Sequence, residues 1–145
     1  MSKEQNFKRV KTNSVKGTFK GEVKNLLSNK SYEFNTEEVW RNNDDGFLTV
    51  YAEIPDPEAE GGEASIALQF KNSEQPSGDF PYNAPEIRTL RYGRSNPSTR
   101  YTAKSGTVKF QHHPDKKING KLEFETETLA NDQYHVTVIF VADAP

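Results

Sequence analysis

Hydrophobic and polar positions alternate most clearly in residues 106–142. Apolar side chains recur at every second position in 106–110, 118–126 and 134–142, which is the period of a β-strand. Polar breaks separate these segments, first at 112–117 and again before Tyr134. The pattern predicts three consecutive strands joined by two turns.

The last of these segments is apolar on both of its faces. Tyr134 and Phe140 belong to one face, whereas Ile139 and Val141 belong to the other. A strand that is apolar on both faces lies in the interior of a sheet or is covered. We therefore expect residues 134–142 to form an interior strand, and we expect any function to reside in the loops before residue 105.

Shorter alternations predict further strands earlier in the chain, at 15–23, 31–35, 47–54, 64–70, 87–92 and 101–103. Between the second and third of these, residues 36–40 favour one helical turn with Thr36 as its cap. The sequence Asp45-Gly46 between two apolar segments predicts a hairpin turn. Three prolines in 71–86 exclude a central strand from that loop.

About eight short strands with turn signals between them indicate an all-β fold. We expect a single antiparallel β-sandwich or a lipocalin-like barrel with at most one short helix. The length of 145 residues is that of one domain. We assign residues 15–145 to this domain and residues 1–14, which are polar and basic, to a mobile arm.

Composition excludes several kinds of chemistry. The chain has no cysteine, which removes disulfides, thiolate nucleophiles and cysteine-bound zinc. No apolar run near Met1 resembles a signal peptide, and no stretch has the length of a membrane span. We therefore expect a cytoplasmic location by default, with secretion by another route left open. No cofactor-binding motif is present, so no cofactor is expected.

The net charge of −2 conceals a block pattern. Residues 1–32 and 87–121 are basic, whereas 33–86 and 122–145 are acidic. One interpretation is that these blocks lie beside each other and neutralise within the fold. The other is a basic face for an anionic partner, or self-association, so that the protein is a monomer or a weak oligomer.

The three histidines suggest a metal site only at first sight. His112 and His113 fall in one predicted turn, and His135 follows the opposite turn. The intervening strand would hold the two turns roughly 25–30 Å apart, so the three side chains cannot share one ion. The acidic residues of 56–63 are of a type that binds calcium, but a solvated loop is the simpler interpretation. We therefore predict no metal site.

Arginine and tyrosine cluster in the loops at 76–86 and 93–100 and in the strands beside them. Such residues suit a glycan, because tyrosine stacks on the sugar ring and arginine donates hydrogen bonds to its hydroxyl groups. They also suit single-stranded nucleic acid, but the acidic net charge of the chain disfavours that ligand. If a site exists, we expect it at a rim made by these two loops. The candidate ligand-binding residues are Tyr82, Arg91, Tyr92, Arg94, Arg100 and Tyr101. Trp40, the single tryptophan, is interpreted as a core anchor.

The second half of the chain contains a recognisable series of elements. It consists of a Gly-Asp-Phe corner at 78–80, a short strand at Tyr101, the segments 106–110 and 118–124, and a final apolar strand. In this order they resemble a group of small uncharacterised bacterial β-proteins with a lipocalin-like or sandwich fold, many of them exported lipoproteins. The resemblance covers roughly residues 46–142. It implies the fold and brings no catalytic residues, and this chain lacks the leader and the lipidated cysteine of that group.

Three functional hypotheses follow. The first is a non-enzymatic binding module that recognises a protein partner or a glycan or other small polar ligand through its loops. The second is a small hydrolase with a pair of carboxylates, for which no catalytic residue stands out. The third is a structural or self-associating protein.

Overall fold

The computed structural model describes residues 14–145, whose eleven strands form one antiparallel sheet. The strands are β1 (Ser14–Val15), β2 (Gly17–Asn25), β3 (Lys30–Thr36), β4 (Val39–Asn42), β5 (Leu48–Pro55), β6 (Glu63–Phe70), β7 (Gly78–Pro81), β8 (Ile87–Ser95), β9 (Ser98–His112), β10 (Ile118–Thr126) and β11 (Tyr134–Ala142). A 3₁₀ turn, η2 (Asp44–Gly46), joins β4 to β5 at the predicted hairpin.

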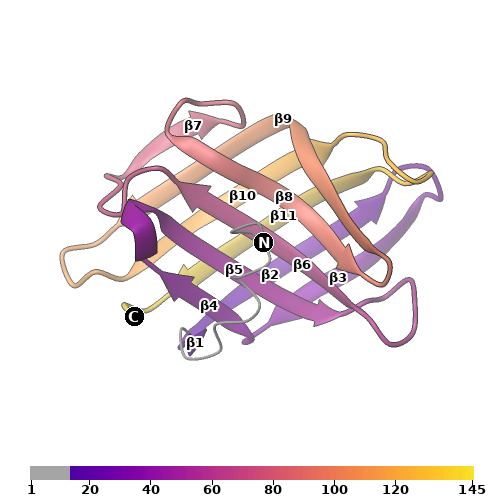
Figure 1. Cartoon of the computed structure of the whole chain (residues 1–145), viewed down its shortest axis with the longest axis horizontal. Helices are drawn as coiled ribbons and strands as arrows, with labels where there is room; N and C mark the ends of the chain where they lie inside the picture. Colours follow the sequence, from indigo (N-terminus) through magenta and orange to yellow (C-terminus); the bar gives the residue numbers. More distant parts are fainter. Residues whose placement is uncertain (1–13) are drawn as a thin grey trace.

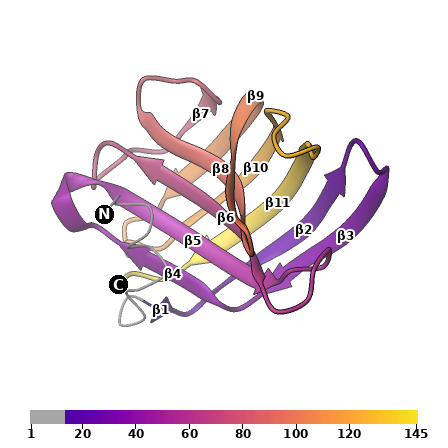
Figure 2. The ribbon, with the colours of Figure 1, turned by 45° about the vertical axis from the view of Figure 1, so that its right-hand side comes forward.

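The sheet is curled into a half-barrel. Its strand order is β1-β4-β5-β6-β8-β9-β10-β11-β2-β3, with β7 paired to β9. β4, β5 and β6 lie in front of β11 and β2 (Figure 1), and the turned view shows the same sheet bending round from β5 to β3 (Figure 2). The predicted all-β, antiparallel, barrel-like fold is confirmed. The sheet has eleven strands instead of about eight because β1, β4 and β7 are too short to show an alternation.

The core fills the space inside the curl. Side chains from every strand from β2 to β11 except β7 are buried there. Its ring pairs include Phe19–Phe140 on the paired strands β2 and β11 (5.3 Å between centroids) and Phe70–Phe110 on the non-adjacent strands β6 and β9 (4.7 Å). β11 pairs with β10 on one side and β2 on the other, so the predicted interior strand is confirmed. Its outer face is open to solvent, because Ile139 is 56% exposed.

The predicted helical turn at 36–40 is wrong. Val39 and Trp40 belong to β4, which pairs with β5. Thr36 accepts a hydrogen bond from the Glu38 amide (2.9 Å), but this local bond shapes a bend between two strands. Trp40 is 3% exposed and packs on Tyr51 with 5.5 Å between ring centroids. It is buried as expected, but in a small cluster with Tyr51 and Ala67 that is separate from the main core.

Most of the predicted basic arm, residues 1–13, lies outside the described residues. Its last residue, Ser14, is instead part of β1 and pairs with Trp40.

The strands predicted at 101–103 and 106–110 form one strand, β9, which bends at Gly106. The first part of β9 pairs with β8 and the last part with β7, while β10 runs along its other side. Gly106 has a φ of +124°, a conformation that favours glycine. This bend lets one strand carry two different neighbours.

Four connections gather at one end of the half-barrel, which we call the loop end (Figure 1, right). They are the turns 26–29, 56–62, 96–97 and 127–133. The Leu26 amide donates to the Gln133 carbonyl (2.7 Å), which ties the first of these turns to the last. The loop end therefore brings together residues far apart in the sequence.

Candidate functional site: an ionic cluster at the loop end

The structure divides the six candidate ligand-binding residues among three places. Tyr92, Arg94 and Tyr101 face the inside of the curl at the loop end. Arg91 alternates with Tyr92 along β8 and therefore points to the outer face, as does Arg100, which is paired with Gly93. These two arginines are thus separated by the sheet from the other three residues.

Tyr82 lies elsewhere. Its amide donates to the Gly106 carbonyl (2.9 Å), which is roughly 25 Å along β9 from the start of that strand at Ser98. The loops 76–86 and 93–100 therefore do not form the single rim that the clustering of arginine and tyrosine suggested. Of the six candidate residues, the inner group of Tyr92, Arg94 and Tyr101 is the one that lies together at the loop end.

Arg94 and Asp56 form the centre of this inner group. The Arg94 Nε donates to Asp56 Oδ2 at 2.8 Å, and the Asp56 side chain is fully buried. Asp56 sits directly after β5, where its amide donates to the Gly62 carbonyl (2.9 Å) and its Oδ1 accepts from the Glu58 amide (2.8 Å). The loop backbone therefore helps to hold this carboxylate in its position beside Arg94.

Two more carboxylates surround the pair. Asp132 lies 3.5 Å from Arg94 Nη1, and the Asn25 Nδ2 donates to both Asp132 and Glu58 at 2.9 Å. The Asn25 Oδ1 accepts from the amides of the following turn, which orients the side-chain amide toward the carboxylates. We call Asn25, Asp56, Glu58, Arg94 and Asp132, together with their tyrosine neighbours, the ionic cluster.

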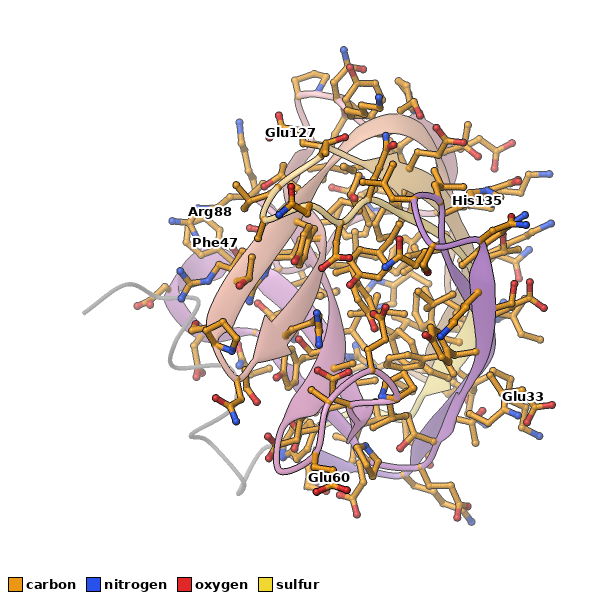
Figure 3. The ribbon with its side chains drawn as sticks, turned by 90° about the vertical axis from the view of Figure 1, so that its right-hand side faces the viewer. Glu33, Phe47, Glu60, Arg88, Glu127 and His135 are labelled. Atoms are coloured by element: carbon orange, nitrogen blue, oxygen red, sulfur yellow. The ribbon has the colours of Figure 1, made fainter. Side chains whose placement is uncertain are left out.

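Three tyrosine rings form the floor of the cluster. The Tyr134 ring lies 4.5 Å from Tyr92 and 4.9 Å from Tyr101 between centroids, and its hydroxyl donates to Glu58 Oε1 at 2.7 Å. Tyr32, on β3, also lies beside Glu58. The view onto the loop end shows side chains filling this region between the labelled Glu60 and Glu127 (Figure 3).

The electrostatics keep these groups in fixed protonation states. Burial raises the pKa of Tyr92, Tyr101 and Tyr134, and Glu58 raises that of Tyr134 further. Burial alone would lower the pKa of Arg94, but its hydrogen bond to Asp56 and the nearby carboxylates hold the pKa above its ordinary value. The tyrosines are therefore neutral donors at neutral pH, and Arg94 is a permanent cation.

One polar atom of the cluster stands out. Among residues 14–145, the buried Tyr92 hydroxyl has no hydrogen-bond partner, although Asp56, Glu58 and Arg94 lie near enough to influence its pKa. A buried hydroxyl without a partner is costly, so such atoms are uncommon in folded proteins. The cluster therefore has hydrogen-bonding capacity that the chain itself does not use.

We expect Tyr92→Phe to leave the free energy of unfolding unchanged or to raise it by about 1 kcal/mol, because the substitution removes an unpaired buried hydroxyl. Tyr134→Phe is the matched comparison. It deletes the hydrogen bond to Glu58 and should lower the free energy of unfolding by about 1.5–3 kcal/mol. Urea unfolding followed by tryptophan fluorescence measures both values. A loss in Tyr92→Phe as large as that in Tyr134→Phe would contradict the assignment.

The geometry of the histidines agrees with the sequence argument. His112 pairs with Ile118, whereas His135 pairs with Glu125, so seven residues of β10 separate them, roughly 23 Å. Within residues 14–145, no three histidine or acidic side chains are arranged to hold a metal ion. There is also no helix in this part of the chain with the length and apolarity needed to cross a membrane.

Sequence reasoning missed most of the cluster. The acidic loop 56–63 was interpreted as solvated, but Asp56 is buried. Asn25 at the end of β2 and Asp132 in the turn 127–133 are single polar residues and carried no signal, and Tyr134 was recognised only as an apolar position of the last strand. The unusual density of acids and prolines in 55–63 was the feature that could have drawn attention to this loop.

Comparison of the chain with protein-family models, with curated proteins and with solved structures found no match.

Proposed function

We propose that the protein is a non-enzymatic binding protein that takes a small, hydroxylated, positively charged ligand, such as an amino sugar, at the loop end. The observation that carries this proposal is the ionic cluster with its unused Tyr92 hydroxyl. Three carboxylates (Asp56, Glu58 and Asp132) surround one guanidinium, which leaves a formal charge of −2. A cation complements that charge, and hydroxyl groups complement the donors and acceptors around it.

An open hollow lies on the loop that contributes Asp56 and Glu58 to the cluster. Its volume is about 480 Å³, and it is lined entirely by the loop from Pro55 to Gly62. The loop contributes Asp56, Glu58 and Glu60 to this hollow and no basic side chain. Asp56 is buried in the cluster, whereas Glu58 is half-buried and Glu60 is exposed on the same loop. The negative charge of this loop beside the hollow supports a cationic occupant.

The alternative of a carboxylate-pair hydrolase has less support. Asp56 accepts from Arg94, and Glu58 accepts from both Tyr134 and Asn25. A general base needs a carboxylate that is available to a water molecule or a substrate proton. Here the carboxylates are engaged as acceptors, which suits recognition.

Titration with glucosamine, glucose and glucuronate tests the proposal, because these probes share one ring and differ in charge. We expect glucosamine to shift the backbone amide resonances of residues 56–62 at the lowest concentration and glucuronate at the highest. Glu60→Gln should weaken glucosamine binding about two- to fivefold, since it removes one exposed charge beside the hollow.

Glu127→Gln is the matched control, because Glu127 is also exposed at the loop end but lies across from Glu60 (Figure 3). It should leave glucosamine binding unchanged. Absence of shifts in residues 56–62 with all three sugars at about 50 mM, well above ordinary ligand affinities, would overturn the proposal. Equal affinity for glucosamine and glucuronate would overturn the charge preference.

A further inference from the structure

The outer face of β9, β10, β11 and β2 carries two parallel rows of charge. In the first row, register places Lys109 beside Lys121, Lys121 beside Ile139 and Ile139 beside Lys20. In the second, two residues along each strand, Glu123 lies beside Thr137, Thr137 beside Glu22 and Glu22 beside Glu33. We call these the lysine row and the glutamate row; they lie roughly 7 Å apart.

Each row places like charges side by side within one molecule, and of the lysines in the lysine row only Lys109 also has an acidic register partner, Asp79 of β7, on its other side. Lys109 and Lys121 are direct cross-strand partners, as are Glu22 and Glu33, and like charges in such positions destabilise a sheet. The charged side chains of both rows are exposed. Among residues 14–145, the lysines of the row form no ion pair, and Glu123 pairs only with His135, at 3.5 Å.

An apolar side chain lies in the middle of this charged surface. Ile139 is 56% exposed between Lys121 and Lys20, and Val141, next on the same face, is 38% exposed. The other two large apolar side chains that are exposed, among the described residues, are Leu27 and Leu129, which lie in loop-end turns. The face of β10, β11 and β2 is therefore an apolar centre flanked by charge.

From this pattern we infer that the face binds a second copy of the same chain. A two-fold axis that runs parallel to the rows and between them brings the lysine row of one copy over the glutamate row of the other. Lys121 then meets Glu123 of the second copy and Lys20 meets its Glu22, and the same two pairs recur by symmetry. Ile139 is covered at the centre. The surface is thus self-complementary, as a two-fold interface requires.

The geometry also sets the strength of this dimer. The outer face of a curled sheet curves away from a partner, and beside Ile139 it also has an open hollow of about 600 Å³ lined by Lys109, Lys121 and Val141. Contact is therefore confined to the central strands β10, β11 and β2 and their immediate neighbours. Five strands span roughly 19 Å, which makes a small interface of the weak, transient class. We expect dissociation constants on the order of 100 µM at low salt, and weaker association at high salt because the exposed ion pairs are screened.

Two charge-reversal variants test the inference. In K20E/K121E both rows become acidic in the central strands, and in E22K/E123K both become basic, so each variant alone should remain monomeric. An equimolar mixture of the two should form a heterodimer at least as tight as the parent dimer. Sedimentation velocity at about 20 mM and 500 mM salt, with protein up to roughly 1 mM, measures all three samples.

The control is K71E/K104E, which makes the same change in net charge as K20E/K121E but at exposed lysines outside both rows. It should dimerise like the parent. A parent chain that stays monomeric at roughly 1 mM and low salt overturns the inference. So does a mixture of the two variants that fails to associate while the parent dimerises, because that result places the contact on another face.

Discussion

Arg94→Met is expected to lower the free energy of unfolding by about 3–5 kcal/mol, because it leaves the Asp56 carboxylate buried without its cation. The Asp56 side chain has no exposed surface and retains only the hydrogen bond from the Glu58 amide. Removing one partner of a buried ion pair is more damaging than removing both. The double variant D56N/R94M should therefore unfold at a higher urea concentration than Arg94→Met alone.

Lys104→Met is the control for this experiment. Lys104 is exposed on β9, so its replacement removes one positive charge without exposing a buried partner. It should change the free energy of unfolding by less than about 0.5 kcal/mol. If Arg94→Met lowered the free energy of unfolding no more than Lys104→Met does, the Arg94–Asp56 pair would be incidental to stability. If D56N/R94M lowered the free energy of unfolding more than Arg94→Met does, the unpaired carboxylate would not be the cause of the loss.

Local sequence was sufficient to predict the long strands but not the short ones. The segments 118–126 and 134–142 were predicted with the bounds that β10 and β11 have, because each is a long alternation with one face in the core. Thr36 and Trp40 misled the prediction because a local capping signal competed with pairing between β4 and β5. That pairing is a tertiary effect, and β4, with only four residues, is too short for its alternation to reveal a strand.

The site was predictable only in part for a related reason. Tyr92, Arg94 and Tyr101 were found because they lie close together in the sequence, in one hairpin. Their partners come from other connections: Asp56 is 38 residues from Arg94, and Asn25 is 107 residues from Asp132. Which turns meet at the loop end depends on the strand order of the curled sheet, and no local pattern encodes that order.

Gly106→Ala is expected to destabilise the fold by about 3 kcal/mol or more, because two separate costs add at this position. The φ of +124° is strained for any residue with a Cβ atom. A Cβ there would also lie 2.1 Å from the Glu123 carbonyl oxygen and 2.5 Å from the Phe124 Cα, both backbone atoms of β10. The ladder between β9 and β10 would have to move to relieve this overlap.

Gly46→Ala separates the two costs. Gly46 also has a positive φ, +79°, but a Cβ there would meet no atom within 4 Å. Its replacement should therefore cost only the backbone strain, about 1 kcal/mol. Thermal unfolding of both variants measures the difference, which we assign to the contact with β10.

Because the bend at Gly106 lets β9 turn from β8 to β7, Gly106→Ala should also weaken protection from amide hydrogen exchange in β7, whereas Gly46→Ala should not. Equal losses of stability in the two variants would mean that the sheet relaxes around the Cβ and that the bend is not a fixed part of the fold.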